Sequence, residues 1–222
     1  MLKFARSEPS GVLLAAQLLA VLFYPFLEKG DVGRSLFSVF GIAILGLVVL
    51  AVRDVPGHTW PGLVLAVPAT VLLVIQAVTR DDSLLPYSSA IEAILYFYAA
   101  GLLIRYMLAD HRITRDELFA IGATFTLVAW AFAYSFTVCQ AAAPGSFTAA
   151  VEPAADRSWM ELLFLSFTTL SSTGLSDVVP IRAFARAMVM LEQLAGVAYI
   201  AIVVSRLIGL LLLEDRARAE SR

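Results

Sequence analysis

A run of small hydroxyl residues interrupted by one glycine is the part of the sequence whose residue types could bind a ligand. It spans residues 168–177 and reads TTLSSTGLSD. Hydroxyl and backbone carbonyl oxygens together can replace the hydration shell of a cation. The same hydroxyls are candidate nucleophiles, but no histidine lies in the apolar segments described below to act as their base. The pattern therefore favours cation coordination over catalysis.

Other chemical patterns are weak. His58 and His111 fall in polar stretches, and neither has a second type of metal ligand at a suitable spacing. Cys139 is the sole cysteine, which excludes an intrachain disulfide. The sequence has neither a phosphate-binding G-x-x-x-x-G-K motif nor a G-x-G-x-x-G motif. We therefore predict no enzyme, no cofactor and no resident metal site.

The composition places these residues in a membrane. Hydrophobic residues make up 60% of the 222 residues and charged residues only 15%, and the mean hydropathy is +0.84. Soluble domains carry roughly 25% charged residues. The net charge of −2 gives no basic excess that would indicate a nucleic acid partner.

Six apolar stretches are long enough to cross a bilayer, which requires about 17 to 25 residues of helix. They are residues 11–27, 35–52, 62–78, 89–108, 118–139 and 183–213. The first stretch follows two basic residues, as in a signal peptide, but it ends in Tyr-Pro-Phe-Leu-Glu without a small-residue cleavage site, so we expect a retained helix. Thr114 and Asp116 are the expected cap residues of the fifth helix.

The region before the last helix has a different pattern. Residues 141–158 are rich in Ala, Pro, Gly and Ser, which predicts an exposed loop. Residues 159–170 are apolar but too short to span, and a run of 10 to 14 residues is typical of a buried or re-entrant helix. Irregular backbone at membrane depth is tolerated only where it packs in protein or lines a water-filled cavity. The turn at residues 172–176 therefore indicates a pore.

The distribution of basic residues predicts the orientation. With the N-terminus inside, ten Lys and Arg residues fall on the cytoplasmic side and six on the outer side. The positive-inside rule then places both termini in the cytoplasm.

Only Arg105 is basic in the fourth helix, whereas a voltage sensor would carry a basic residue at every third position. We therefore expect no arginine voltage sensor in this helix.

A short helix ending in Thr and Ser, a glycine turn closed by an aspartate, a proline and a long helix follow one another over residues 158–209. This order resembles the pore domain of the potassium channel superfamily, in which the loop reads T-L-T-T-x-G-Y-G-D. The matching positions are Thr169, Leu170, Ser171, Ser172, Gly174, Asp177 and the downstream Pro180. The last helix resembles small bacterial members at Ala185, Arg186, Leu191, Glu192, Gly196, Tyr199, Arg206, Leu207 and Gly209.

The resemblance implies an all-α transmembrane fold with six spans, a re-entrant pore helix and a filter loop. It also implies a homotetramer in the inner (plasma) membrane of a prokaryote, in contact with lipid. The implied filter is Ser172, Thr173, Gly174, Leu175, Ser176 and Asp177. The carbonyls of residues 173–175 and the hydroxyls of Ser172 and Ser176 would line the ions, with Asp177 at the outer mouth. The only metal ions implied are permeant K⁺ and, as an alternative, Na⁺.

The filter departs from the family pattern at two positions. Leu175 and Ser176 replace the usual tyrosine and second glycine. A side chain at a left-handed position costs on the order of 1 kcal/mol, so we expect Ser176 to adopt another conformation. Leu175 cannot donate the hydrogen bond of a tyrosine hydroxyl. The loop also resembles, over a few residues, the single-glycine filter loops of bacterial potassium-uptake transporters.

Three further residues lie within predicted membrane helices. Gly196, in the last helix, is either a gating hinge or a point of close packing. Glu192 lies one turn earlier, and we predict that it braces the pore helix through a hydrogen bond rather than binding ions. Glu92 is expected at the outer membrane interface.

The sequence thus predicts a peripheral four-helix domain at residues 1–116, a pore domain at residues 117–213 and a short cytoplasmic tail at residues 214–222. The predicted function is a tetrameric monovalent cation channel that conducts potassium. Two alternatives stay open: a non-conducting or auxiliary membrane subunit with the channel fold, and a cation transporter. A separate regulatory subunit is also open.

Overall fold

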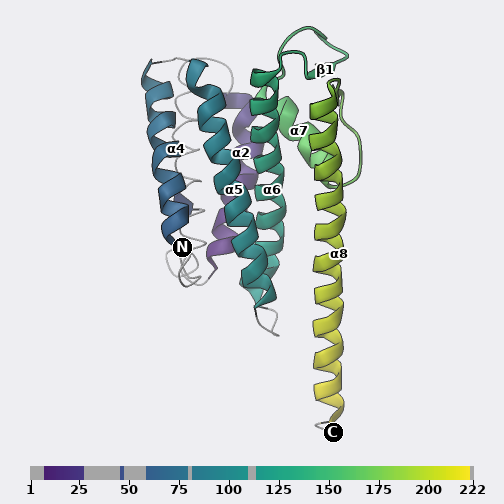
Figure 1. Ribbon diagram of the computed structural model, residues 1–222. Coiled ribbons are helices and arrows are strands. Elements are labelled where there is room, and N and C mark those ends of the chain that lie inside the picture. The colour runs from purple at the N-terminus through teal and green to yellow at the C-terminus, as the bar shows by residue number, and fades with distance from the viewer. Residues whose placement is uncertain (1–7, 28–45, 48–58, 80–81, 110–113, 221–222) are drawn as a thin grey trace.

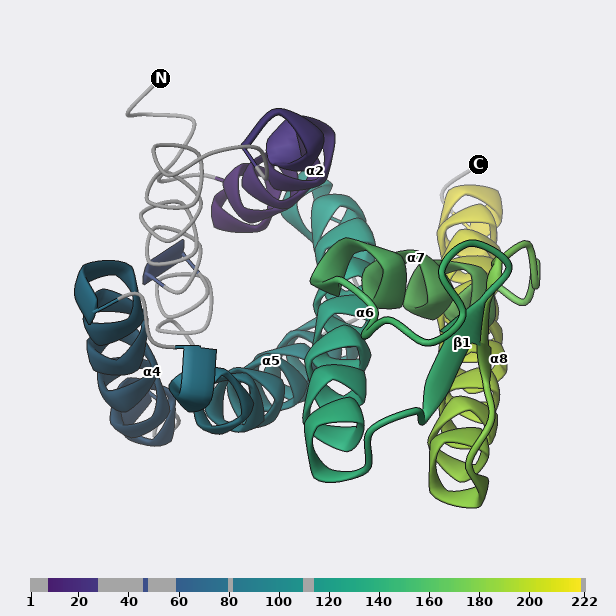
Figure 2. The same cartoon turned by 90° about the horizontal axis from the view of Figure 1, so that it is seen from above.

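The helices of the molecule stand side by side, with one short helix held between two long ones (Figures 1 and 2). The computed structural model describes residues 8–27, 46–47, 59–79, 82–109 and 114–220. The elements are α2 (Pro9–Leu27), α4 (Thr59–Thr79), η1 (Asp82–Leu84), α5 (Leu85–Leu108), α6 (Arg115–Ala142), β1 (Phe147–Ala149), α7 (Trp159–Leu170), β2 (Val178–Pro180) and α8 (Ala183–Glu220).

Five of the six predicted spans coincide with described helices, α2, α4, α5, α6 and α8. The second predicted span, residues 35–52, lies almost wholly outside the described residues. Within the part of the chain that the structure describes, α2, α5, α6 and α8 are long and apolar enough to cross a membrane, and α4 contains the shorter apolar stretch Val64–Gln76. The protein is therefore an all-α, multi-pass membrane protein.

The helix boundaries follow from capping and composition. Thr114 accepts a hydrogen bond from the amide of Glu117 over 3.2 Å, and the Glu117 carboxylate accepts one from the Thr114 amide over 3.4 Å. This reciprocal capping box satisfies two of the donors left open at the start of α6, and such a cap contributes about 1 kcal/mol. At the other end of the chain, α8 continues to Glu220, so most of the segment predicted as a polar tail is helical.

α2 lies against α6 and runs in the same direction. Ser10 donates from its amide and from its hydroxyl to the carboxylate of Asp116, each over 2.9 Å. Further along, a Cβ on Gly122 would lie 2.8 Å from Leu14. Asp116, predicted as a cap, thus serves to anchor the start of α2, while Thr114 is the cap.

The core between α5 and α6 contains an aromatic cluster and one carboxyl group. Tyr96 packs edge-on to Trp130, with ring centroids 5.9 Å apart, and Trp130 packs edge-on to Trp159 at the start of α7 over 5.5 Å. Glu92 is 2% exposed and is hydrogen bonded to Tyr134. The prediction of an interfacial Glu92 was therefore wrong, because its face of α5 turns toward α6 and not toward the membrane surface.

Candidate functional site

The segment from β1 to β2 enters the helix bundle and returns to the side from which it came. β1 precedes α7 and β2 follows the loop at residues 171–177, yet the two strands pair antiparallel in the register Phe147↔Pro180, Thr148↔Val179 and Ala149↔Val178. The amide of Ile181 extends the pairing by donating to the carbonyl of Ser146 over 2.8 Å. The two ends of the segment that contains α7 therefore lie side by side, and α7 is a helix of 12 residues, shorter than a membrane span.

The start of α7 is fixed by two sets of polar contacts. Ser158 and Glu161 form a second capping box, in which the Glu161 carboxylate accepts from the Ser158 amide over 2.7 Å. Arg157 is 6% exposed; its guanidinium pairs with Glu161 over 3.1 Å. It also donates to the carbonyls of Val151, Glu152 and Ala155 in the preceding loop. Arg157 therefore ties this loop to the first turn of α7.

The second half of α7 packs tightly against α8. A Cβ built on Gly196 would lie 2.0 Å from the carbonyl oxygen of Leu170, the last residue of α7. One turn before Gly196, the Glu192 carboxyl is hydrogen bonded to the hydroxyl of Ser166. Ser166 also donates to the carbonyl of Ala129 in α6 over 2.7 Å. The short helix is thus held between the two long helices, as Figure 2 shows.

The loop after α7 folds its amides back onto the end of the helix. The amides of Thr173 and Gly174 both donate to the carbonyl of Thr168 over 3.0 Å, and the amide of Ser172 donates to the carbonyl of Thr169 over 3.0 Å. Ser172 and Gly174 have left-handed backbone angles, with φ of 60° and 64°. These turns let consecutive amides reach carbonyls that the last turn of α7 leaves open.

The amide directions also fix the directions of three carbonyl groups. In a trans peptide the C=O of one residue points opposite to the N–H of the next, and the described residues contain no cis peptide. The amides of residues 172–174 point into α7, so the carbonyls of Ser171, Ser172 and Thr173 point away from it. Of the three carbonyls predicted as ion ligands, at residues 173–175, only that of Thr173 has its direction set in this way.

The remaining predicted filter residues lie on the outer side of the same loop. Leu175 is 77% exposed, and Asp177, two residues later, is also exposed. Ser176 has no left-handed backbone angle, and its hydroxyl accepts from the amide of Val178 over 3.1 Å. The expectation that Ser176 adopts a different conformation from glycine is confirmed. The loop therefore presents carbonyl and hydroxyl oxygens on a face that one chain leaves uncovered.

One comparison with known families bears on this arrangement. Residues 121–212 match the family model described as "Ion channel". The match supports a relation of these residues to the ion channel pore-domain superfamily. The match covers α7, its loop, β2, most of α6 and most of α8, which is less than half of the chain. Neither a curated protein nor a solved structure matches the chain significantly.

α8 has little cover from its own chain. Large apolar side chains are exposed along it, among them Phe184 at 68%, Leu191 at 63% and Leu194 at 67%. Beyond α6 and α7, Figure 1 shows α8 extending well past the ends of the other helices. An uncovered apolar surface of this length requires lipid or further protein around it.

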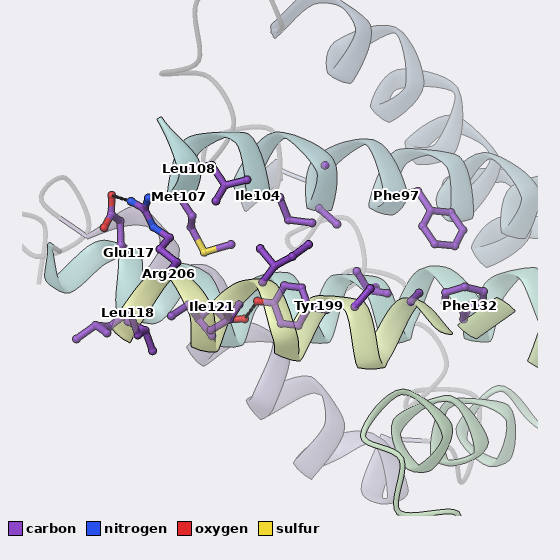
Figure 3. A pocket seen from close by; sticks show the side chains of 18 residues that line it. Phe97, Ile104, Met107, Leu108, Glu117, Leu118, Ile121, Phe132, Tyr199 and Arg206 are labelled. Carbon is purple, nitrogen blue, oxygen red and sulfur yellow. Dashed lines mark hydrogen bonds and ion pairs between the residues drawn. The ribbon is translucent and has the colours of Figure 1, made fainter. Parts of the chain in front are cut away.

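The middle of α8 borders an apolar cavity of about 360 Å³ formed with α5 and α6. Figure 3 shows Phe97, Ile104 and Met107 of α5 across from Tyr199 of α8. The Tyr199 hydroxyl donates to the carbonyl of Ile121 over 2.6 Å. At one end of the cavity, Arg206 lies 3.5 Å from the carboxylate of Glu117 (Figure 3), so the far half of α8 is fastened to the start of α6.

Several residues that position the site were not singled out from the sequence. Ser166 joins α7 to α6, and Arg157 binds Glu161 in the first turn of α7. The Thr168 carbonyl accepts hydrogen bonds from two amides of the loop. A Ser-x-x-Glu pattern at residues 158–161 was the available signal for the start of α7. A lone serine in an apolar helix carries no comparable signal, because its sequence does not say which face it occupies.

Proposed function

We propose that the protein is a subunit of a tetrameric channel that conducts potassium and related monovalent cations through the loop at residues 171–177. The carbonyls of Ser171, Ser172 and Thr173 point away from α7, and this observation carries the proposal. Such carbonyls, directed at a common axis, replace water around a dehydrated cation. The hydroxyl of Ser172, which is exposed on the same segment, would add a further oxygen ligand.

The electrostatics of α7 favour a cation over an anion. The C-terminal end of a helix carries roughly half a negative charge, and α7 ends at Leu170, directly before the loop. Asp177 is exposed at the far end of the loop, where a carboxylate raises the local concentration of cations. Both features attract positive charge toward the same short segment.

One chain supplies a single loop, which cannot surround an ion. Closed cyclic symmetry is the usual way in which identical loops come to face one axis, and the family resemblance implies four copies. The exposed apolar length of α8 supports an assembly in which inner helices pack around the axis. We place residues 117–213 in this pore domain and residues 1–116 in a peripheral domain, with both termini in the cytoplasm and the assembly in the plasma membrane.

A second function has specific support. The missing tyrosine and second glycine, at Leu175 and Ser176, favour a non-conducting subunit that keeps the channel fold. In that case the chain would assemble with a partner whose filter is intact. A transporter that uses the same loop as its constriction is the third possibility.

Recording from purified protein in planar bilayers separates these functions. The proposal predicts a native mass of four chains and unitary current steps in potassium. A mass of four chains that carries no current, together with a co-purifying channel subunit, would favour the auxiliary role. Saturable uptake coupled to a second ion, without unitary steps, would favour a transporter.

A further inference from the structure

The carboxyl group of Glu192 lies in the interior of the pore domain, among three helices. Glu192 is 0% exposed within a single chain, so its contacts exist before any assembly. Its Oε1 is hydrogen bonded to the hydroxyl of Ser166 in α7. The same hydroxyl lies 2.7 Å from the carbonyl oxygen of Ala129 in α6. Three oxygen atoms from α8, α7 and α6 thus form a continuous chain.

Counting donors places the protons in this chain. A serine hydroxyl has one hydrogen to donate, and a backbone carbonyl can only accept. If Ser166 donates to Ala129, the hydrogen between Ser166 and Glu192 must come from Glu192. A neutral carboxylic acid supplies one O–H donor, whereas a carboxylate supplies none.

The second carboxyl oxygen gives independent support. Oε2 of Glu192 is buried and has no hydrogen-bond partner among the residues that the structure describes. An unpaired carbonyl oxygen of a neutral acid is far less costly in an apolar interior than an unpaired carboxylate oxygen. The geometry around both oxygens therefore agrees with an uncharged side chain.

No charged group among the described residues of the packed elements offsets a negative charge at this position. On α6, Glu117 pairs with Arg206 of α8. On α7, Glu161 is held by Arg157 and Ser158. Arg186 of α8 donates to the carbonyl of Pro180, and Tyr199 donates to that of Ile121. Cys139 and Tyr134 of α6 belong to the outer hydrophobic and aromatic clusters.

We propose that Glu192 is a neutral acid in the folded protein and donates its proton to Ser166, which in turn donates to the carbonyl of Ala129. This relay of two hydrogen bonds makes Glu192 a positioning residue for the loop. It joins α8 to α6 through α7 one turn from the point where Gly196 meets Leu170, and the loop begins at the next residue. Ionisation of Glu192 would reverse the Ser166 hydrogen bond and leave two acceptors, Ser166 Oγ and the Ala129 carbonyl, facing each other.

Infrared difference spectroscopy of the purified protein in lipid vesicles tests the proton directly. The carbonyl stretch of a protonated carboxylic acid should be present at neutral pH in the wild type and missing in E192Q. E161Q is the matched control on α7, because Glu161 is ion-paired, and E92Q separates any signal from the other buried carboxyl group. In Ser166→Ala the acid band should persist but shift, because the acid has lost its acceptor.

Flux measurements form the second arm, which rests on the proposed function. E192Q keeps an N–H donor toward Ser166 and should conduct, whereas Ser166→Ala, which lacks the hydroxyl between Glu192 and Ala129, should conduct less. If the carbonyl band of the protonated acid is present but the protein carries no flux, the result would contradict the proposed channel function and leave this inference intact. An identical spectrum for wild type and E192Q in the acid region, or an acid band that does not move in Ser166→Ala, would overturn the inference.

Discussion

Gly196 of α8 meets the carbonyl oxygen of Leu170 at the end of α7, with space for no side chain between them: an added Cβ would lie 2.0 Å from that oxygen. Backbone atoms surround the position, so a side chain cannot be accommodated by a rotamer change. α8 and the last residue of α7, which directly precedes the loop at residues 171–177, are therefore in close backbone contact.

We expect Gly196→Ala to force α8 away from α7, lowering the free energy of unfolding by about 1 to 3 kcal/mol, as overpacked sites do, and reducing ion flux. Thermal unfolding of the detergent-solubilised assembly measures the first effect. Gly209→Ala is the matched control, because nothing lies within 4 Å of a Cβ there; alanine should leave stability equal or raise it by up to about 1 kcal/mol. A hinge without close packing would instead give altered gating with unchanged or raised stability for Gly196→Ala.

Gly174 is limited by its backbone and not by space. Its φ is 64° and no atom lies within 4 Å of a Cβ built on it. Substitution by Val should abolish cation flux while leaving tetramers intact, because a β-branched side chain disfavours the left-handed angles that direct the loop. Gly145, with φ of 76° and equal open space in the outer loop, offers the comparison: Gly145→Val carries the same local strain and should conduct. Equal flux from both variants would show that the loop has been assigned wrongly.

The long helices of the protein could be predicted from hydropathy because a bilayer requires long apolar runs. α7 was predictable for the complementary reason, since 12 apolar residues cannot span. Periodicity did not reveal which side of each helix faces protein, because apolar residues occupy all faces of a membrane helix. The interfacial placement of Glu92 failed on this point, since its position along α5 was inferred without its rotation about the helix axis.

Within the loop, glycine is the residue type expected at a left-handed position, and Gly174 has such a backbone angle. The second left-handed residue, Ser172, could not be predicted from its type. Ser172 adopts φ of 60°, although serine carries no signal for that conformation. The reason is tertiary: the amides of residues 172–174 are drawn to the carbonyls of Thr168 and Thr169. The three carbonyls directed away from α7 follow from these contacts and could not be read from residue types.

The ion pair between Arg206 and Glu117 should contribute measurably to stability because both side chains are largely buried, with 16% and 6% of their side-chain surfaces exposed. Glu117→Gln keeps the capping box, since glutamine serves at that position, and removes only the charge. We expect a loss of about 1 to 3 kcal/mol in the free energy of unfolding, the usual cost of removing one member of a buried polar contact.

Arg115→Gln, at an exposed position in the same turn, is the charge control for this pair and should change stability by no more than about 0.5 kcal/mol. Chemical denaturation in detergent, completed as a double-mutant cycle with Arg206→Gln, gives the coupling energy. A coupling energy of zero would mean that the two side chains do not interact in the folded protein.

Tyr134 supplies the hydrogen bond to the buried carboxyl group of Glu92. Tyr134→Phe should lower the free energy of unfolding by about 1 to 3 kcal/mol, because a buried polar group then loses its partner. Tyr87→Phe removes the same hydroxyl from a side chain on α5 that is 66% exposed, and should be neutral. Equal thermal midpoints for the two variants would contradict the buried placement of Glu92.

Cation flux through the purified protein in liposomes tests the central claim, that ions pass through the loop after α7. Gradients of potassium, sodium and N-methyl-glucamine are compared in the same vesicles, with Gly174→Val as the blocked reference. We predict rapid potassium flux, no flux of N-methyl-glucamine and no potassium flux in the variant. A wild-type protein that forms tetramers but passes no cation under any gradient would contradict the account.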